Sequence, residues 1–403
     1  MADGDYMFTS ECVTMGHPDK VADQISDGIL DKVLECDYKG RVACETLVTK
    51  GLVFVAGEMT TECWVDINRL IRDIVKEIGY TFDQENGFYF RSLAVVNTIH
   101  EQSPEIGEAA AGVGRKAQTK DEYIDSLSAG DQGMMFGFAC DETEELMPMP
   151  ITLARALCDA LARARRDGVL DWLRPDGKTQ VTVIYRDGRP VGLKEIVVST
   201  HHAPLHDDKE KEDALIREAI IEEVVRKAIP SSMLEGFDFG SQLLVNPSGR
   251  FTKGGPGADT GLTGRKIIVD TYGGMGRHGG GCFSGKDPSK VDRSGAYAAR
   301  YIAKNIVAAG LARRCEVEIA YAIGLKDPRS IYVDTFGTGV VPETKLADAI
   351  REIFPLKVSD IVRHFDLLRP IYLRTAREGH FGIPDYPWEK TDKVEALKDY
   401  FGK

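Results

Sequence analysis

The sequence predicts an α+β fold in which one structural unit occurs three times. The order helix, β-hairpin, helix recurs along the 403 residues. The three hairpins open at Val42, Gln180 and Val317, which are 138 and 137 positions apart. A proline, whose fixed φ suits helix initiation, stands beside the first turn of each opening helix. These prolines are Pro18, Pro150 and Pro288.

The first unit gives the clearest periodicity. Its opening helix, expected over 19–35, has an apolar stripe at helical spacing that includes Val21, Ile25 and Ile29. Two β-rich runs follow at 41–48 and 52–58, and a second amphipathic helix follows at 64–78. The second and third units repeat this order. Their expected elements are 151–167, 179–185, 191–200 and 211–228, then 289–310, 315–323, 330–336 and 343–353.

The weak alternation of each hairpin predicts sheets with one face on helices and the other against a partner sheet or subunit. Connectors are expected at 103–127 and 230–240. Segment 103–127 is long for a connection between compact units, which is typical of a mobile lid that covers a site.

Composition limits the class of protein. The formal charge is -12 and the sequence pI is about 5.3, which argues against a sequence-independent nucleic-acid binder. No apolar run reaches the roughly 18 residues of a membrane helix, and the acidic start lacks a signal-peptide core. The eight cysteines form no C-x-x-C pair, so we expect reduced thiols of a cytoplasmic protein.

A glycine-rich segment between Arg265 and Arg293 collects cations in this acidic chain. Glycines let backbone N–H groups approach a ligand, and cations complement a polyanion, so the segment predicts a phosphate cradle. A solvated surface loop is the alternative. The run GGCFSGKD at 280–287 is a poor P-loop, because Asp287 follows Lys286 where a Ser or Thr is needed. The cations of the segment are Arg265, Lys266, Arg277, His278, Lys286, Lys290 and Arg293.

Units one and three share a polar motif at their opening helices, HPDKVAD at 17–23 and DPSKVDR at 287–293. Helix N-termini favour phosphate, and Asp19 and Asp292 could hold magnesium, although Asp also simply favours a helix start. The second unit lacks these charges, which predicts a site between units one and three. His17 beside the first helix is a candidate contact to the reacting group, with a structural role as the alternative.

Three further acidic residues are candidates. Glu45 lies in mid-strand and must be exposed or bound to a cation. Glu58 ends a strand, and Asp131 in AGDQG sits on a glycine turn that could hold an ammonium group or be a plain turn.

Taken together, the motifs resemble those of methionine adenosyltransferase (S-adenosylmethionine synthetase). The resemblance runs from Phe8 to Lys393. The motifs that carry it are FTSECVTMGHPDKVADQISD, ACET, GEMTT, AGDQG, WLRPDGK, GGPGADTGLTGRK and GGGCFSGKDPSKVDRS. It implies synthesis of S-adenosylmethionine from ATP and L-methionine, then hydrolysis of tripolyphosphate to phosphate and pyrophosphate.

The resemblance also implies the roles of individual residues. His17 would lie near ATP C5′ and the leaving oxygen. Catalytic roles are implied for His17, Lys178, Arg265, Lys286 and Lys290. The implied ATP contacts are His17, Asp176, Lys178, Arg250, Phe251, Asp259, Arg265, Lys266, Cys282 and Lys286. The implied methionine contacts are Glu58, Gln102, Asp131, Asp259 and Lys290. Asp19 and Asp292 would bind magnesium, two ions per site, and Glu45 would bind potassium.

The family fold of three α+β repeats with pseudo-threefold symmetry agrees with the repeat. It implies an N-terminal repeat at 1–102, a central repeat at 117–235, a C-terminal repeat at 237–393 and a mobile active-site loop at 103–127. A homotetramer, as a dimer of dimers with sites between subunits, is also implied. No nucleic-acid or membrane partner is expected.

Small departures accompany the resemblance: Cys282 and Ser128 replace a common Ala and Gly, Gly177 stands where Ala is common, and the 103–127 loop is longer. Two other functions use part of the pattern. A kinase or phosphatase needs only the cationic loop and the magnesium carboxylates, and leaves Glu58, Gln102 and Asp131 unexplained. An inactive ATP- or methionine-sensing subunit would usually have lost a charged position, and none is lost here.

Overall fold

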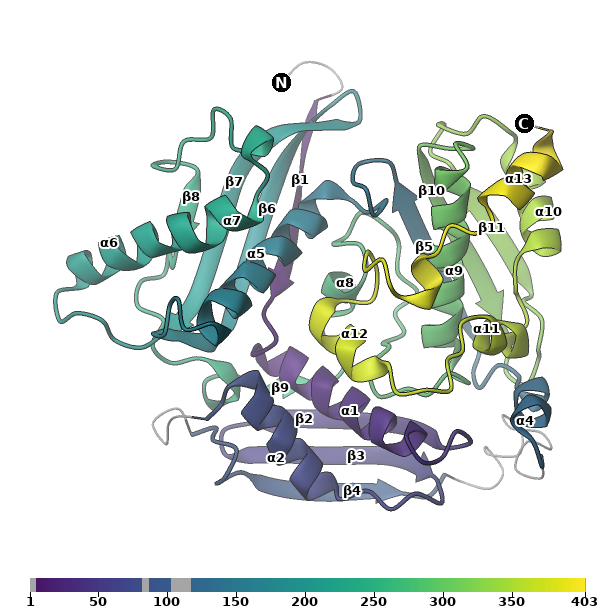
Figure 1. The fold of residues 1–403 in the computed structure, drawn as a ribbon, viewed down its shortest axis with the longest axis horizontal. Coiled ribbons are helices and arrows are strands. Elements are labelled where there is room, and N and C mark those ends of the chain that lie inside the picture. The colour runs from purple at the N-terminus through teal and green to yellow at the C-terminus, as the bar shows by residue number, and fades with distance from the viewer. Residues whose placement is uncertain (1–4, 82–86, 103–116, 403) are drawn as a thin grey trace.

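Three sheets and the helices that cover them surround a common centre in the computed structural model, which describes residues 5–81, 87–102 and 117–402 (Figure 1). Each unit opens with a long helix on its sheet: α1 (Pro18–Leu34), α5 (Met149–Arg166) and α9 (Val291–Ala308). Each has the predicted hairpin. The hairpins are β2 (Arg41–Thr49) with β3 (Leu52–Thr60), β6 (Leu173–Arg186) with β7 (Arg189–His202), and β10 (Arg314–Tyr321) with β11 (Ser330–Asp334).

A second helical region completes each unit. In the first it is α2 (Ile67–Ile78), and in the third it is α10 (Glu343–Ile353). In the central unit a π-helical turn (Ile221–Val225) separates α6 (Lys209–Ile220) from α7 (Arg226–Ala228). The predicted α+β fold of three repeats is therefore confirmed.

The sheets exchange strands between chain segments. Strand β1 (Tyr6–Val13) precedes the first unit yet pairs antiparallel with β6, from Tyr6 opposite Tyr185 to Val13 opposite Lys178. Strand β5 (Gly133–Cys140) precedes the central unit yet pairs with β10. The remaining strands are β4 (Ala94–His100), parallel to β3; β8 (Leu243–Val245), parallel to β7; and the short β9 (Gly261–Leu262), beside β2.

Strand β2 shows the expected one-sided burial. Cys44, Thr46 and Val48 are buried, whereas Glu45 between them is exposed. Buried and more accessible residues alternate along β2, so one face of the sheet packs on α1 and the other carries the more accessible side chains. One face on helices is thus observed, and coverage of the other face by a subunit stays a prediction.

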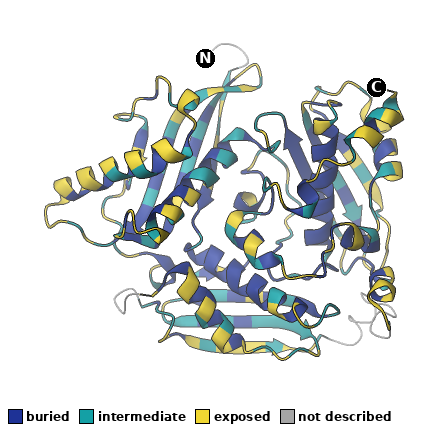
Figure 2. Ribbon diagram, in the orientation of Figure 1, coloured by how far each residue is buried: buried dark blue, intermediate teal, exposed yellow. Residues whose placement is uncertain are grey.

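The apolar cores are unequally divided. One continuous core contains residues of α1, α2, β2, β3, α9 and β10, so units one and three share it. A second core belongs to the central unit and includes β6, β7 and α5. Helices α1 and α9 are almost entirely buried (Figure 2). Units one and three are therefore fixed to each other by apolar burial.

The C-terminal part of the chain returns to this shared core. It contributes α11 (Val358–His364), α12 (Tyr372–Glu378) and α13 (Val394–Phe401), and α12 packs on α1. Glu389, in a 3-10 turn at Pro387–Glu389, forms buried ion pairs with Arg300 (2.8 Å) and Lys304 (2.7 Å) of α9. Trp388 stacks on Tyr297, with ring centroids 3.8 Å apart.

Two predictions about local structure need correction. Cys36 and Cys63 form a disulfide with Cα atoms 6.1 Å apart, so the expectation of eight reduced thiols is wrong for this pair. The end of α1 meets the segment after β3 there, which cysteine spacing alone does not reveal. In the predicted loop 103–127, residues 103–116 lie outside the described residues, but Lys120–Ser126 form helix α4 because Thr119 and Glu122 make a capping box.

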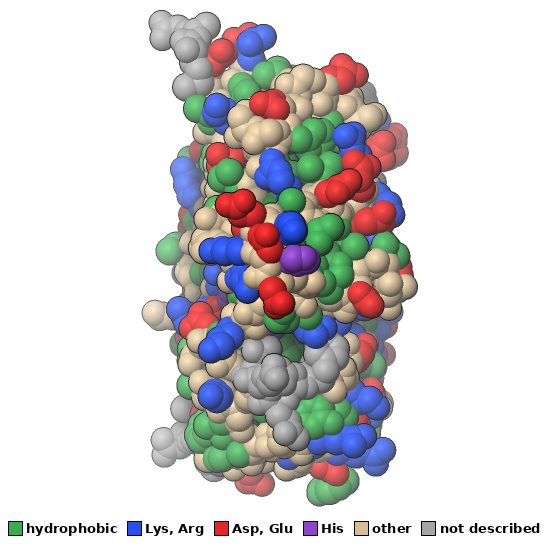
Figure 3. All heavy atoms as spheres, turned by 90° about the vertical axis from the view of Figure 1, so that its left-hand side faces the viewer, with side chains coloured by type: hydrophobic (Ala, Val, Ile, Leu, Met, Phe, Trp, Pro, Cys, Tyr) green, Lys and Arg blue, Asp and Glu red, His purple; other side chains and the backbone are tan. Residues whose placement is uncertain are grey.

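Among the described residues, the side drawn in Figure 3 shows no single basic face that would bind a polyanion. Acidic and basic side chains are interspersed there rather than gathered into one basic surface (Figure 3). Within the described ranges, no helix is long and apolar enough to cross a membrane.

The Glu389 ion pairs give a direct test of the shared core. Glu389→Ala should lower the free energy of unfolding by about 3–5 kcal/mol, because Arg300 and Lys304 would stay buried without a counter-charge. Denaturant unfolding measures this value. Glu395→Ala, which removes an exposed pair with Lys398, is the matched control and should change it by less than about 0.5 kcal/mol. Equal changes in the two variants would contradict the account.

Candidate active site

The site begins where α1 starts. The side chain of His17 caps the helix, its Nδ1 accepting the Asp19 N–H at 3.2 Å, and Pro18 occupies the first turn. This local sequence therefore fixes both His17 and Asp19 at the positive end of the helix dipole.

Asp19 connects the helix to the segment after β9. Its Oδ1 accepts the Leu262 N–H at 3.0 Å, and its Oδ2 accepts a hydrogen bond from Lys266 Nζ at 2.5 Å. Burial alone would raise the pKa of Asp19, but the hydrogen bonds from Lys266 and Leu262 outweigh it and hold the pKa below its ordinary value. Arg265 lies at the edge of this group, with its NH1 4.0 Å from Asp19 Oδ1 and its side chain exposed.

His17 is neutral in this setting. Burial, together with the positive charges of Lys266 and Lys178, lowers the pKa of His17 to about 3. Lys178 comes from β6 of the central unit, as does Asp176, whose Oδ2 accepts the Gly255 N–H at 2.7 Å. Burial raises the pKa of Asp176 to about 6. That hydrogen bond anchors the turn leading to Asp259, whose N–H donates to the Gly255 carbonyl at 3.1 Å.

A second cationic loop runs beside strand β2. Cys44 N–H donates to the Gly285 carbonyl at 2.9 Å. The backbone of Lys286 pairs antiparallel with that of Ala43 and forms a single β-bridge. Gly285 has a φ of +81°, and a Cβ there would lie 2.0 Å from the Cys44 carbonyl oxygen, so only glycine fits this approach. Lys286 pairs with Asp292.

Cys282 brings the two loops together. A Cβ built on Gly264 would lie 2.5 Å from the Cβ of Cys282, so the backbone before Arg265 packs directly on this side chain. Burial raises the pKa of Cys282 to about 11, which keeps it a thiol. Lys266 and Lys286 are thus presented by adjacent loops.

The acidic candidates lie around the second loop. Glu58 of β3 is opposite both Ala43 of β2 and His100 of β4, so it neighbours the Lys286 bridge, and Gln102 follows two residues after His100. Glu58 Oε1 lies 3.8 Å from His100 Nε2. The Asp131 turn docks elsewhere on the same loop, through a 3.2 Å hydrogen bond from Gly130 N–H to the Ser289 carbonyl, next to Lys290.

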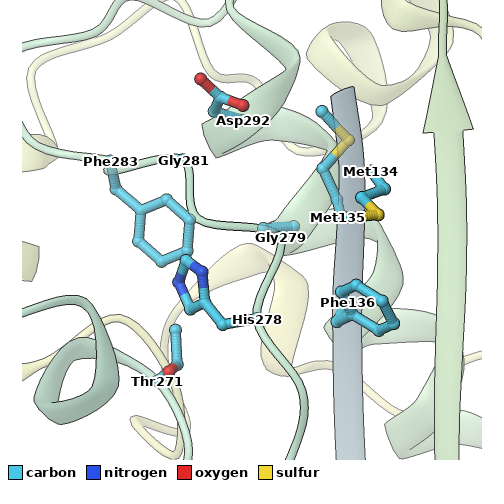
Figure 4. A pocket seen from close by; sticks show the side chains of 10 residues that line it. Met134, Met135, Phe136, Thr271, His278, Gly279, Gly281, Phe283 and Asp292 are labelled. Carbon is cyan, nitrogen blue, oxygen red and sulfur yellow. The ribbon is translucent and has the colours of Figure 1, made fainter. Parts of the chain in front are cut away.

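A small pocket adjoins Asp292, between the loop 278–283 and β5 (Figure 4). Met134 and Met135 line it from the strand, and His278 and Phe283 line it from the loop. His278 Nδ1 accepts the Gly280 N–H at 2.8 Å.

Some predicted cations are committed elsewhere. Arg293 is not part of a ligand surface, because it is completely buried and pairs with Asp27. Arg277 pairs with Glu316 of the third sheet at 3.0 Å. Lys290 contacts Asp287. The seven-cation cradle predicted from sequence is therefore wrong for Arg293, whose side chain is fully buried, and Arg277 is exposed but directed to the sheet that contains β10 and β11.

Arg250 and Phe251 contact the central unit. Arg250 Nε is 2.5 Å from Oε2 of the buried Glu212, and Phe251 stacks on His201 with ring centroids 5.4 Å apart. Among the described residues, no hydrogen bond or ion pair joins them to either cationic loop.

The chain matches three family models in succession: the N-terminal domain of S-adenosylmethionine synthetase over residues 5–104, its central domain over 126–251 and its C-terminal domain over 253–390. The chain belongs to the S-adenosylmethionine synthetase family. The S-adenosylmethionine synthase of Thermus thermophilus is 56% identical over 396 residues, covering 97% of this chain and 98% of that protein. That of Wolinella succinogenes is 54% identical over 399 residues, covering 98% of each.

Family membership confirms the resemblance in the motifs. The protein is an ATP-dependent transferase, a methionine adenosyltransferase, and makes S-adenosylmethionine. The roles of individual residues stay predictions. Sequence reasoning missed Lys20, Asp23, Asp27 and Asp270, all buried beneath the loops. The four-residue spacing of the aspartates on a helix was the available signal.

The neutral state of His17 has a consequence for stability. Above pH 6.5 the imidazole is neutral in both folded and unfolded chains. Below pH 6.5 the unfolded chain binds a proton that the native pocket does not bind until about pH 3, so the free energy of unfolding falls by up to about 1.4 kcal/mol per pH unit.

Denaturant unfolding of metal-free protein between pH 6.5 and 5 tests this, with His17→Asn for comparison. The variant should show a shallower decline in the free energy of unfolding than the unsubstituted protein. Identical slopes would show that His17 takes up its proton over the same pH range in the folded and unfolded chains, which would contradict the lowered pKa.

Proposed function

We propose that the enzyme forms S-adenosylmethionine by attack of the methionine sulfur on C5′ of ATP and then hydrolyses the displaced tripolyphosphate to phosphate and pyrophosphate. The observation that carries the proposal is the pair of adjacent cationic loops, with Lys266 beside Asp19 and Lys286 beside Asp292. A thioether sulfur needs no activating base, and the barrier lies in expelling a polyanion. A site rich in fixed cations suits that step.

The triphosphate would be gripped by Arg265, Lys266 and Lys286. Donors placed where charge grows are worth on the order of 3 kcal/mol each in comparable sites. Fixing sulfur in line with C5′ adds proximity, worth about 7–11 kcal/mol at best. These two effects are sufficient without a protein nucleophile.

His17 would contact the leaving oxygen as a hydrogen-bonding imidazole. Its lowered pKa makes it a neutral group at working pH, so it would orient the leaving oxygen and not supply a full positive charge. Lys178, whose charge contributes to that lowering, would supply charge beside it.

The remaining residues would divide between the substrates. We assign Glu58, Gln102, Asp131, Asp259 and Lys290 to methionine. Glu58 and Asp131 carry carboxylates that could hold its ammonium group, and Lys290 could face its carboxylate. The nucleotide contacts are assigned to Asp176, Lys178, Arg250, Phe251, Asp259 and Cys282.

Two magnesium ions fit the donor set. Asp19 and Asp292 are single carboxylates beside lysines, and the described part of the chain contains no group of three His, Cys, Asp or Glu that could hold a metal by itself. Mg²⁺ is commonly held by one or two carboxylates together with substrate phosphates, so these two aspartates would hold it with ATP. Bound magnesium would neutralise phosphate charge. Glu45, exposed on β2, would hold potassium.

Assembly and location are also proposals. A homotetramer, as a dimer of dimers with sites between subunits, is consistent with the open face of the sheet that carries Glu45 and Glu58. We propose a cytoplasmic location without nucleic-acid or membrane partners, although the Cys36–Cys63 disulfide is a bond more typical of oxidising compartments.

Product analysis tests the proposed function. Purified protein is mixed with ATP, magnesium, potassium and L-methionine, and the products are separated. S-adenosylmethionine with equimolar phosphate and pyrophosphate is expected. Phosphate release that is indifferent to methionine, without S-adenosylmethionine, would indicate a kinase or phosphatase instead.

Lys286→Met in the same assay should reduce S-adenosylmethionine formation by at least about 100-fold, because one fixed cation on the leaving group is lost. Lys345→Met, at an exposed helix position paired with Asp348, is the control and should retain full activity. Near-normal turnover by Lys286→Met would contradict the assigned role.

A further inference from the structure

Helix α1 carries a ladder of four carboxylates on successive turns. They are Asp19, Asp23, Asp27 and Asp31. Residues four apart lie on one face of a helix, and like charges at this spacing repel each other unless each has a partner. Every member of the ladder accepts backbone N–H groups from a segment far away in the sequence.

Asp23 holds the loop that contains Arg265 and Lys266. Its Oδ1 accepts the Gly264 N–H at 2.9 Å, and its Oδ2 accepts a hydrogen bond from Lys20 Nζ at 3.0 Å. Lys20 also donates to Asp270 at 2.7 Å, at the far end of the same segment. All three charged side chains are buried.

Asp27 holds the second loop in the same way. Its Oδ1 accepts the Gly285 N–H at 2.9 Å. Both its oxygens accept hydrogen bonds from Arg293, at 2.8 and 2.7 Å, and Arg293 also donates to the Lys286 carbonyl at 3.0 Å. The loop is therefore held on both sides of the Gly285–Lys286 peptide.

Asp31, the last member, is different. Its carboxylate accepts the N–H groups of Tyr372 and Leu373 at the start of α12, at 2.8–3.1 Å. It is a carboxylate on the same face of the same helix, but it is bonded to neither cationic loop. It therefore serves as an internal control.

We infer that Asp23 and Asp27 are positioning residues for the polyphosphate. In both loops the anchored amide belongs to the glycine immediately before a cation, Gly264 before Arg265 and Gly285 before Lys286. One rigid helix thus sets where both cations stand relative to each other. The inference rests on the proposed function, because it assumes that these cations grip the triphosphate.

The spacing of the aspartates along the helix sets the spacing of the two cationic loops. Asp23 and Asp27 are one turn apart, about 6 Å along the axis, and each fixes the backbone of one loop. A loop released from its aspartate would keep its cation but lose the fixed position, and misplacement of this kind reduces binding and rate.

Asp23 is the residue to test, because loss of Asp27 would leave the buried Arg293 without a counter-charge. In Asp23→Ala, Lys20 keeps Asp270 while the Gly264 N–H loses its acceptor. Asp23→Asn retains an oxygen that can accept this N–H, and Asp31→Ala is the control.

Three quantities are measured on the full-length protein: the KM for ATP, the KM for methionine, and the dissociation constant of inorganic tripolyphosphate. Asp23→Ala should raise the KM for ATP and the dissociation constant about 10- to 100-fold. Its KM for methionine should stay within about twofold. Asp23→Asn should show a smaller rise of at least about threefold, because a neutral amide oxygen still accepts the Gly264 N–H but holds it more weakly than a carboxylate does.

Asp31→Ala should lower the melting temperature while leaving the KM for ATP and tripolyphosphate binding within about twofold. If the Asp23 variants lose stability as Asp31→Ala does and leave polyphosphate affinity unchanged, Asp23 is merely structural and the inference is overturned. Should Asp23→Ala not fold, an unchanged affinity in Asp23→Asn overturns it equally.

The unsubstituted protein separates this inference from the proposed function. If it binds tripolyphosphate but makes no S-adenosylmethionine, the proposed function fails while the dissociation constants still decide the role of Asp23.

Discussion

The structure depends on one buried helix that is both apolar and highly charged. Helix α1 packs its Val and Ile side chains into the core shared by units one and three, and on another face it buries the carboxylates of Asp23 and Asp27. A buried charge without a partner costs several kcal/mol, so each must be compensated. Lys20 compensates Asp23 and also pairs with Asp270, and Arg293 compensates Asp27, so these pairs bring the C-terminal half of the chain to the helix.

This constraint explains why the site lies where it does. The same helix presents His17 and Asp19 at its first turn and anchors both cationic loops along its length. In a chain with a net charge of -12, specific contacts are needed to hold these cations in one place. The buried carboxylates of Asp23 and Asp27 hold the two loops through backbone N–H groups. The side chains of Lys266 and Lys286 remain partly accessible to solvent.

The helices and hairpins could be predicted from sequence because they are local features. The opening helix of unit one, expected at 19–35, is Pro18–Leu34, and the hairpin strands agree to within a few residues. Strand exchange could not be predicted, because the pairing of β1 with β6 joins residues about 170 positions apart and leaves no periodic signal. The disulfide joins cysteines only 27 positions apart, but cysteine spacing alone does not reveal it.

The site was predictable in type and less so in detail. Glycines beside cations predicted a phosphate cradle, and the motif shared by the helix starts of units one and three predicted a site between those units. The arrangement of the cations on two adjacent loops, held by backbone N–H groups, was not predicted. Sequence could not separate cations that face a ligand from those that compensate buried acids, so Arg293 was placed with the first kind. Nor could it show that burial beside Lys266 and Lys178 keeps His17 neutral.

The central claim is that carbon, not phosphorus, is the atom attacked. ATP carrying oxygen-18 in the bridge between C5′ and the α-phosphorus distinguishes the two, with mass analysis of every product after turnover with methionine. The account predicts that all of the label leaves in phosphate and pyrophosphate, and that none remains with the adenosyl product. Label retained in a nucleotide or on the adenosyl carbon would contradict it.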